Sequence, residues 1–247
     1  MSDRERFAGV VVCATGSWYD VMADDGARYR CRMRGRMRLR GARSTNPVVV
    51  GDMVSVSDDG GDFVIEDIAP RRNYIIRRAS NLSKESHIIA ANIDRALLVV
   101  TLASPRTAPE FVDRFLVTCE AYSVPVTILL AKSDLTAGIR DEAEAFRATY
   151  EGAGYDVLEI SALNGDGLDA VRELVAGRTT LVAGNSGVGK STLIGALDPS
   201  FEVRTGEISQ SHLKGRHTTT FSTMYPLCGG GFIIDTPGIK GFGLIDI

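Results

Sequence analysis

The sequence predicts two regions of different fold class, a small all-β barrel followed by an α/β domain with a parallel sheet. Five short strand-like segments, separated by polar turns, fill about the first 75 residues. From Ala96 onward, apolar strand patterns alternate with helical patterns, which is typical of a doubly wound α/β domain. We place the boundary so that the barrel takes residues 1–78 and the α/β domain takes residues 79–247.

The composition is that of an ordinary globular protein: of 247 residues, 44% are hydrophobic and 24% are charged. No apolar run approaches the roughly 18 residues that a membrane-spanning helix needs. The first residues, Met1 to Arg6, do not resemble a signal peptide. The four cysteines are far apart in the sequence, which favours reduced thiols over disulfides or a zinc site. We therefore expect a cytoplasmic protein with no membrane partner. We also expect a monomer, although these observations do not bear on the oligomeric state.

The amino-terminal segments have the period of two that is typical of strands. Turn signals at Asp24–Gly26 and Asp58–Gly61 interrupt them, and Gly35 marks a bend or a turn that would split the third segment into two strands. The five predicted strands are Phe7 to Ala14, Trp18 to Ala23, Arg28 to Arg40, Asp52 to Val56 and Phe63 to Ile68. This pattern indicates a small antiparallel barrel, of which the oligonucleotide-binding OB-fold is a common form.

Every second residue from Arg28 to Arg40 is an arginine, so the strand period puts all the arginines on one face. Residues 1–78 hold 14 Lys and Arg against 11 Asp and Glu, although the whole chain has a net charge of −3. Seven arginines with no acid among them repel one another unless an anion neutralises them, so we favour RNA or another polyanion over a merely solvated strand face. The predicted RNA-binding residues are Arg28, Arg30, Arg32, Arg34, Arg36, Arg38, Arg40 and, in the following loop, Arg43.

A phosphate-binding P-loop, GNSGVGKS, covers Gly184 to Ser191. It lies between a strand pattern at Thr179 to Ala183 and the start of a helix at Ser191 to Leu197. In such a loop, glycines let backbone N–H groups converge on phosphate oxygens, the lysine (Lys190) reaches the terminal phosphates, and the hydroxyl group (Ser191) binds Mg²⁺. Both the motif and its context therefore predict nucleotide binding.

Strands and helices alternate on both sides of the P-loop. The predicted strands are Ala96 to Leu102, Val126 to Leu130, Val157 to Ile160, Thr179 to Ala183, Phe221 to Leu227 and Phe232 to Asp235. The predicted helices are Pro109 to Ala121, Arg140 to Ala153, Leu168 to Ala176 and the helix that starts at Ser191. We expect a parallel sheet, which binds ligands where its strands end.

Three further motifs follow strand ends. In Asp235-Thr236-Pro237-Gly238, the carboxylate of Asp235 is well placed to hold Mg²⁺ through water, and the amide of Gly238 to sense the γ-phosphate. Ala131-Lys132-Ser133-Asp134 resembles the guanine-reading [NT]KxD motif of GTPases, and Ser161-Ala162-Leu163 resembles the loop that backs the guanine. Together with the P-loop, these motifs predict a GTPase.

The motifs occur in an unusual order. Conventional GTPases begin with the P-loop, whereas here the base-reading motifs come first and the P-loop, His217-Thr218-Thr219-Thr220 and Asp235 to Gly238 follow. Rotating the order restores the usual cycle, and such rotation is feasible because domain termini often lie close together. We therefore predict a circularly permuted P-loop GTPase domain preceded by an OB-fold-like barrel.

The segments GNSGVGKST, KGRHTTT and DTPGIKGFGL, after an OB-like domain, carry a resemblance that covers essentially the whole chain. The chain resembles the ribosome small-subunit-dependent GTPase A family, also called RsgA, YjeQ or EngC. The resemblance implies that it binds the small ribosomal subunit and its rRNA during late maturation. It also implies hydrolysis of GTP, the substrate, with Mg²⁺ as cofactor, in response to the subunit.

The resemblance also assigns site residues. Lys190 neutralises charge on the β- and γ-phosphates, and Ser191 and a switch I threonine bind Mg²⁺, with Thr219 favoured over Thr218 and Thr220. The predicted GTP-binding residues are Ala131, Lys132, Ser133, Asp134, Ser161, Ala162, Gly184, Asn185, Ser186, Gly187, Val188, Gly189, Lys190, Ser191, Thr192 and Gly238. The predicted metal site is Ser191, Thr219 and, through water, Asp235.

Two positions depart from the usual GTPase pattern. Many GTPases have a glutamine directly after DxxG that orients the attacking water, whereas this chain has Ile239. His217 in switch I is the candidate for that role, so the predicted catalytic residues are His217 and Lys190. Ala131 replaces an Asn or Thr that ties the nucleotide loop to the P-loop, which leaves guanine selectivity to Asp134, with Lys132 packing over the base.

The end of the sequence also departs from the family. Members continue into a helical zinc-binding module with a Cys/His cluster, whereas this sequence stops at Ile247 and contains no ligands for such a site. We expect a truncated or shortened form that does not bind zinc.

Two other functions stay open at this point. One is a nucleotide-switched RNA-binding checkpoint protein with negligible turnover. The other is a P-loop ATPase or kinase, which the base-reading motifs disfavour but Ala131 keeps open.

Overall fold

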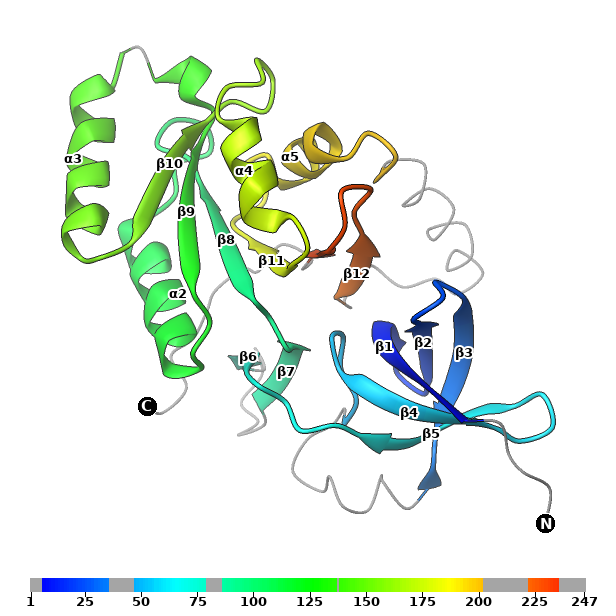
Figure 1. The fold of residues 1–247 in the computed structure, drawn as a ribbon. Helices are drawn as coiled ribbons and strands as arrows, with labels where there is room; N and C mark the ends of the chain where they lie inside the picture. Colours follow the sequence, from blue (N-terminus) through cyan, green and yellow to red (C-terminus); the bar gives the residue numbers. More distant parts are fainter. Residues whose placement is uncertain (1–5, 36–46, 79–85, 137, 202–221, 236–247) are drawn as a thin grey trace. The chain divides into compact units, whose positions relative to one another are not determined.

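The computed structural model describes residues 6–35, 47–78, 86–136, 138–201 and 222–235, which form two compact units (Figure 1). The first unit is built from the described residues up to Ile93, together with Ser222, Thr223 and Met224. The second is built from the described residues between Asp94 and Phe201 and from Tyr225 to Asp235. The predicted domain boundary between residues 78 and 79 stays a prediction.

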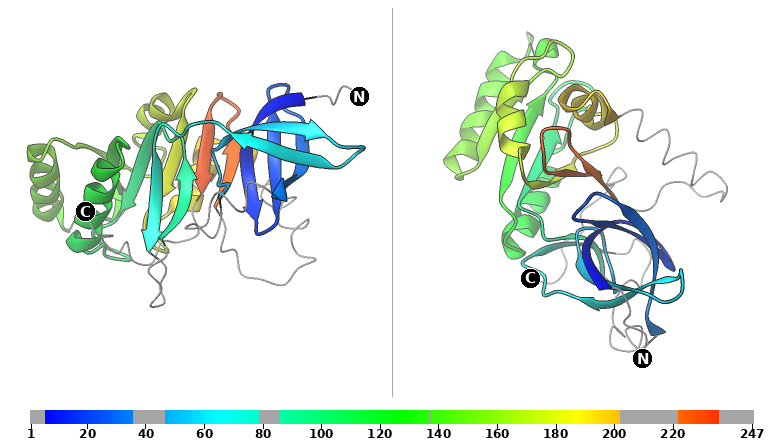
Figure 2. Two further views of the ribbon diagram at one scale, coloured as in Figure 1. Left: turned by 90° about the horizontal axis from the view of Figure 1, so that it is seen from below. Right: turned by 45° about the vertical axis from the view of Figure 1, so that its right-hand side comes forward.

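The first unit contains a closed five-stranded barrel. Its strands are β1 (Arg6–Thr15), β2 (Trp18–Ala23), β3 (Arg28–Met33), β4 (Met53–Asp58) and β5 (Phe63–Ile68). They pair in the order β1-β2-β3-β5-β4, and a further pairing of β4 with β1 closes the barrel. Only the β3–β5 pair among these is parallel. Figure 2 shows these strands curving around a common interior, and the architecture confirms the predicted OB-fold-like barrel.

The barrel core follows from the alternation of side chains along each strand. Its buried residues are Val11, Ala14, Tyr19, Val21, Cys31, Val48, Val54, Val56 and Ile65. Phe7, Tyr29 and Phe63 pack beside them, with ring centroids 4.5 Å apart for Phe7 and Tyr29 and 4.8 Å apart for Tyr29 and Phe63. The aromatic contacts thereby join three different strands of the barrel.

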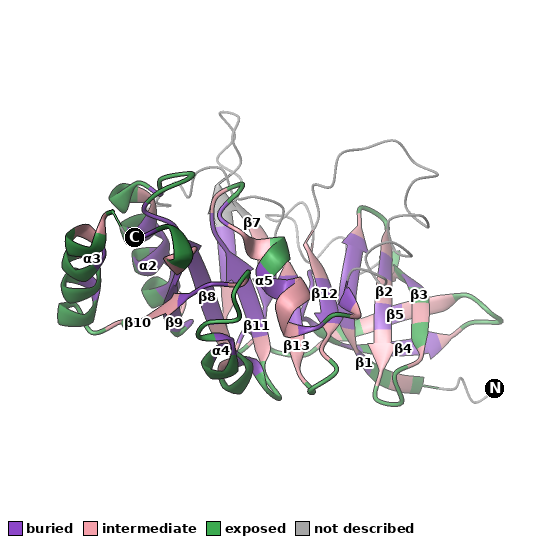
Figure 3. Cartoon of the chain, turned by 90° about the horizontal axis from the view of Figure 1, so that it is seen from above, coloured by how far each residue is buried: buried purple, intermediate pink, exposed green. Residues whose placement is uncertain are grey.

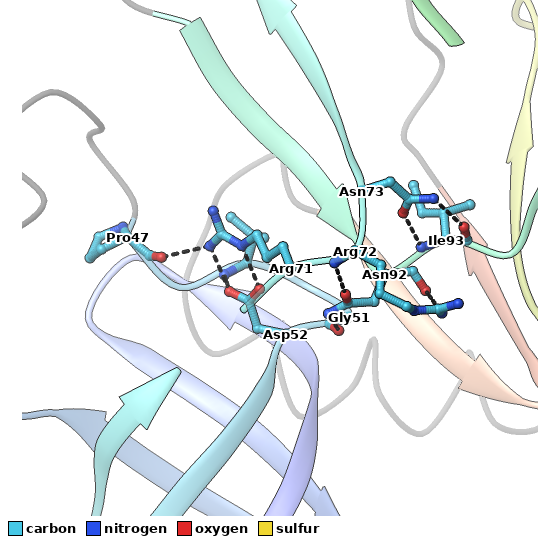
Figure 4. A network of polar contacts seen from close by, with 9 residues as sticks. Pro47, Gly51, Asp52, Arg71, Arg72, Asn73, Asn92 and Ile93 are labelled. Carbon is cyan, nitrogen blue, oxygen red and sulfur yellow. Dashed lines mark hydrogen bonds and ion pairs between the residues drawn. The ribbon is translucent and has the colours of Figure 1, made fainter. Parts of the chain in front are cut away.

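A buried ion pair holds the segment after β5 against the start of β4 (Figure 4). Asp52 has no exposed surface, and its carboxylate accepts hydrogen bonds from Arg71 Nε at 2.7 Å and Arg71 Nη2 at 2.8 Å. The same carboxylate accepts a bond from the Val49 N–H at 2.8 Å, and Arg71 also donates to the Pro47 carbonyl oxygen. Such a bidentate pair, with further hydrogen bonds from Val49 to the carboxylate and from Arg71 to Pro47, is the geometry that offsets the cost of burying charge.

A second polar network holds the hairpin formed by β6 (Tyr74–Arg78) and β7 (Ser86–Ala91). Asn92 donates from Nδ2 to the Gly51 carbonyl oxygen at 2.9 Å, and Asn73 exchanges two 2.8 Å hydrogen bonds with the backbone of Ile93. Gly51 has a φ of +87°, and a Cβ there would lie 2.1 Å from the Ala91 carbonyl oxygen. Only glycine therefore allows this close approach.

The second unit is built on a parallel sheet. Its parallel strands are β8 (Arg95–Val100), β9 (Val126–Ala131), β10 (Asp156–Ile160), β11 (Thr179–Ala183) and β13 (Phe232–Asp235). They pair in the order β10-β9-β8-β11-β13, with β12 (Thr223–Pro226) next to β13. This arrangement confirms the predicted α/β fold with a parallel sheet.

Helices cover both faces of this sheet (Figure 1). They are α2 (Pro109–Ala121), α3 (Arg140–Gly152), α4 (Leu168–Val175) and α5 (Lys190–Leu197), with a 3-10 turn, η1 (Ser133–Leu135), after β9. One core cluster joins residues of α4 and α5, such as Val171 and Ile194, to Leu97, Leu129 and Val182 of the strands. Figure 3 shows β8 and β11 buried along most of their length, as expected for parallel strands covered on both faces.

Two differences from the predicted elements are informative. In the segment predicted from Arg28 to Arg40, β3 ends at Met33, just before the bend or split expected at Gly35; the rest of that segment, within residues 36–46, lies outside the described residues. The strand predicted from Val126 to Leu130 extends by one residue, so that β9 includes Ala131, the first residue of the base-reading motif. Among the helices of the described ranges, none combines the length and the apolar character needed to span a bilayer.

We expect Asp52→Asn to lower the free energy of unfolding of the barrel by about 3 kcal/mol, because it leaves Arg71 without its buried partner. Urea unfolding followed by the fluorescence of Trp18, the one tryptophan of the chain, measures this change. Asp67→Asn, at an exposed position of β5, is the matched control and should stay within about 0.5 kcal/mol of the unmodified chain. Equal stability of the two variants would contradict the assignment.

Candidate nucleotide site and arginine face

The predicted nucleotide-binding motifs meet at one edge of the parallel sheet. Lys132 to Asp134 follow β9, Ser161 follows β10, the P-loop follows β11, and Asp235 is the last residue of β13. Because parallel strands all end at the same edge, these segments of distant sequence become neighbours. The sheet order puts the base-reading segments on one side of the P-loop and Asp235 on the other.

The P-loop takes its shape from glycines with positive φ. Gly184 has a φ of +146°, and a Cβ there would lie 2.4 Å from the Val99 carbonyl oxygen of β8. Gly189, with a φ of +103°, precedes the first residue of α5. The loop is thus pressed against β8 and leads directly into a helix amino terminus, which suits phosphate binding.

Lys190 lies over the P-loop and close to Asp235. Its Nζ donates hydrogen bonds of 2.8 Å to the carbonyl oxygens of both Gly184 and Asn185. Burial lowers the pKa of Lys190 and raises the pKa of Asp235, and the opposite charge of each partner offsets part of that shift. A cation and a carboxylate that influence each other's charge are therefore present where β11 and β13 end.

The donor set at this point suits a hard divalent cation. The Asp235 carboxylate and the exposed Ser191 hydroxyl in the first turn of α5 are oxygen ligands, which Mg²⁺ prefers. The burial that raises the pKa of Asp235 also makes a neighbouring cation favourable. These residues fit the predicted Mg²⁺ site, whose third member, Thr219, lies outside the described residues.

Ser161 orients Asp134. The Ser161 side chain is fully buried and its Oγ donates a 2.7 Å hydrogen bond to Asp134 Oδ1. The same Oγ accepts a bond of 3.2 Å from the Asn164 N–H, which fixes the direction of the hydroxyl hydrogen toward Asp134. The exposed carboxylate of Asp134 is therefore aimed from a fixed position, as a residue that reads a base edge must be.

Lys132 ties the base-reading loop to the P-loop. It adopts the left-handed conformation, with a φ of +62°, and its Nζ donates to the carbonyl oxygens of Gly187, at 2.9 Å, and Ser104. Ala131 instead packs in the core cluster and is 7% exposed. From the sequence, the connection between the base-reading loop and the P-loop was considered missing, because Ala131 replaces the usual Asn or Thr. Lys132, the residue after Ala131, makes that connection.

The loop between β8 and α2 is a part of the site that the sequence reading missed. Thr101 donates from its backbone to Thr107 Oγ1 at 3.1 Å, and the Thr107 N–H donates to the Thr101 carbonyl oxygen at 2.8 Å. This closed loop presents the Ser104 carbonyl oxygen to Lys132 and brings Pro105 beside Gly187. The sequence did contain a signal for this loop, because it follows a predicted strand and ligands bind at the carboxyl ends of parallel strands.

Several predicted site residues lie outside the described residues: His217, Thr218, Thr219, Thr220, Gly238, Arg36, Arg38, Arg40 and Arg43. Their assigned roles stay predictions.

The described part of the arginine face has the predicted alternation. Arg28, Arg30 and Arg32 are exposed along β3, whereas Cys31 between them is fully buried. The guanidinium carbons of Arg30 and Arg32 lie 4.6 and 4.1 Å from the centroid of the Trp18 ring. These are cation–π contacts, which hold long side chains in place.

Arg34 has a different environment. It forms an ion pair with Glu66, which also accepts a 2.8 Å hydrogen bond from Ser57 Oγ. Burial works to raise the pKa of Glu66, but the bonds from Ser57 and Arg34 outweigh burial and hold that pKa below its ordinary value. Part of the positive charge counted along the strand is therefore neutralised within the barrel.

The four cysteines are free thiols. Burial raises the pKa of Cys13 to about 11 and that of Cys31 to about 12, and it also raises the pKa of Cys119, whereas Cys228 is exposed. Within the described ranges, no three His, Cys, Asp or Glu residues are grouped closely enough to hold a metal ion. The expectation about zinc stays a prediction.

Two family models match the chain. The RsgA N-terminal domain matches residues 8–63, and the RsgA GTPase domain matches residues 68–245. Among solved structures, the chain is similar to YjeQ from Thermotoga maritima, with a TM-score of 0.73, 29% identity and coverage of 97% of this chain and 77% of the other. It is also similar to YloQ, described as a circularly permuted GTPase, with a TM-score of 0.67, 26% identity and coverage of 98% and 75%.

Curated relatives are more similar in sequence. A small ribosomal subunit biogenesis GTPase RsgA from Bacteroides fragilis is 55% identical over 243 residues, which cover 97% of this chain and 78% of the relative. One from Porphyromonas gingivalis is 52% identical over 246 residues, with the same two coverages.

We expect Ser161→Ala to weaken GTP binding about tenfold, because a hydrogen bond to a charged group that orients Asp134 is lost. The affinity for ATP should not change, so the ratio of the GTP affinity to the ATP affinity should fall. Competition titration with GTP and ATP measures both affinities. Thr149→Ala, on the exposed face of α3, is the control, and an unchanged GTP affinity in Ser161→Ala would contradict the assigned role.

Lys132→Met should weaken binding of guanine and adenine nucleotides by the same factor, about fivefold, because it keeps the apolar stem but loses the bonds to Gly187 and Ser104. Direct titration with GDP and ADP measures the two factors. A loss confined to guanine would instead mean that Lys132 acts on the base alone.

Proposed function

Since the chain belongs to the RsgA GTPase family, we propose that it binds the small ribosomal subunit, assists its late maturation and hydrolyses GTP in response to that subunit. The chain is a GTP-hydrolysing enzyme of a circularly permuted fold. The single observation that best supports the site is the convergence of Lys132, Asp134, Ser161, Lys190 and Asp235 at one sheet edge.

The described residues would bind GTP in two parts. Asp134, held by Ser161, reads the guanine edge, and Lys132 keeps the base-reading loop at a fixed distance from the P-loop. The N–H groups of Gly184 to Thr192 and the Lys190 ammonium group bind the phosphates. Lys190 would exchange its bonds to the loop carbonyl oxygens for bonds to β- and γ-phosphate oxygens, where its charge offsets charge that develops during transfer.

Ser191, Asp235 through water, and Thr219 would hold Mg²⁺, which when bound neutralises phosphate charge. The Gly238 amide would bind the γ-phosphate. His217 would orient the attacking water, since Ile239 is apolar and lacks a donor or acceptor for that purpose. We further propose a cytoplasmic monomer whose barrel contacts rRNA through its arginine face.

Single-turnover GTP hydrolysis by the 247-residue chain, with and without purified small subunits, tests this function. We expect subunits to stimulate hydrolysis and an excess of ATP to compete poorly. A rate that subunits leave unchanged would overturn the proposal and favour a nucleotide-switched checkpoint protein.

His217→Ala should keep GTP binding but lower the subunit-stimulated rate about a hundredfold, as expected for loss of a residue that handles the attacking water. The control is His212→Ala, in the same segment of the sequence. Unchanged stimulated turnover in His217→Ala would remove His217 from the mechanism.

A further inference from the structure

The outer face of β2 and β3 carries an indole group with two guanidinium groups on it. Trp18 pairs with Arg32 in the register of the two strands, and Asp20 pairs with Arg30. The guanidinium carbons lie 4.1 Å (Arg32) and 4.6 Å (Arg30) from the centroid of the Trp18 ring. Trp18 is the one tryptophan in the chain and is half-buried, whereas both arginines are exposed.

This grouping needs a reason, because two cations at alternate positions of a strand lie only about 7 Å apart and repel each other. The negative face of the indole ring offsets this repulsion and holds both guanidinium groups in fixed positions. Fixed guanidinium groups lose less conformational entropy when they bind an anion. The result is a cationic and aromatic surface that is formed before any ligand arrives.

Two properties of this surface identify its ligand. The face of strands 2 and 3 is the part of an OB-fold that binds oligonucleotides, and Trp18, at the start of β2, adjoins the β1–β2 turn on the same side. Aromatic rings and guanidinium planes stack on unpaired bases, whose faces are free, whereas bases in a duplex are already stacked on one another.

We propose that Trp18, Arg30 and Arg32 form a stacking shelf that holds a base of an unpaired RNA strand, while the free edges of the two guanidinium groups bind the neighbouring phosphates. A duplex offers only the phosphates. Because the shelf is used only if the barrel binds rRNA, its assignment rests on the proposed function.

Arg28 provides a matched control on the same strand and face. It is exposed, carries the same charge, and pairs in register with Met22 rather than with Trp18. Arg28→Gln and Arg32→Gln therefore remove the same charge, but only Arg32→Gln also removes a contact with the indole ring. Each change should lower the slope of log affinity against log salt concentration by about 0.7 on a single strand if one phosphate contact is lost.

The test uses the full chain and fluorescein-labelled RNA of about ten nucleotides, within the site size of an OB-fold, both unpaired and as a duplex. We expect Trp18→Leu to weaken binding of the single strand about tenfold, with an unchanged salt slope. Duplex binding should fall much less, because the duplex loses only the fixed positions of the two guanidinium groups and no stacking contact. Arg32→Gln should weaken single-strand binding several-fold more than Arg28→Gln. In the unmodified chain, saturation with the single strand should quench Trp18 fluorescence.

The outcomes separate the shelf from the function of the barrel. Equal losses on single strand and duplex, or equal effects of Arg28→Gln and Arg32→Gln, would overturn the shelf and leave the arginines as phosphate contacts. An unmodified chain that binds neither RNA would overturn the proposed rRNA contact of the barrel as well. If Trp18→Leu does not fold, Trp18→Phe, the two arginine variants and the quenching of the unmodified chain decide the question.

Discussion

The nucleotide site depends on one constraint, the parallel direction of β8, β9, β10, β11 and β13. Every loop that leaves the carboxyl end of these strands leaves at the same edge, whatever its order in the sequence. A rotated order of motifs therefore still assembles one site. The position of β8 between β9 and β11 separates the base-reading loop from the P-loop by two strand spacings, about 10 Å. The Lys132 side chain spans this gap. Its Nζ donates hydrogen bonds to the Gly187 carbonyl oxygen in the P-loop and to the Ser104 carbonyl oxygen in the loop after β8.

The barrel shows that equal charges in a sequence acquire different roles through their partners. Arg71 pairs with the buried Asp52, Arg34 pairs with Glu66, and Arg30 and Arg32 contact Trp18. The first arginine stabilises the connection to the hairpin, whereas the last two keep their charge available at the surface. The number of arginines in the region therefore overstates the positive charge that is free at the surface, and the exposed arginines of β3 supply charge that no ion pair within the described ranges neutralises.

Most elements follow from sequence pattern, because the apolar period and the turn residues at each end are local signals. The strands Trp18–Ala23 and Phe63–Ile68 and the helix Pro109–Ala121 have the predicted bounds. The features that could not be predicted from the sequence are those that depend on contacts between distant segments. The tie from Lys132 to Gly187 needs a left-handed residue and a neighbouring strand, and nothing in the local sequence encodes either. The stack of Trp18 on Arg30 and Arg32 likewise needs the register of β2 against β3.

Lys190 and Asp235 are two partly buried charges of opposite sign that a nucleotide and its metal ion would stabilise together. Burial disfavours the charged form of both groups, which lowers the pKa of Lys190 and raises that of Asp235. A phosphate bound at Lys190 adds negative charge and restores the preference of the amine for its charged form. A cation held near Asp235 does the same for the carboxylate. Either ligand alone would favour one buried charge and leave its partner disfavoured, whereas a phosphate and a divalent cation bound together stabilise both.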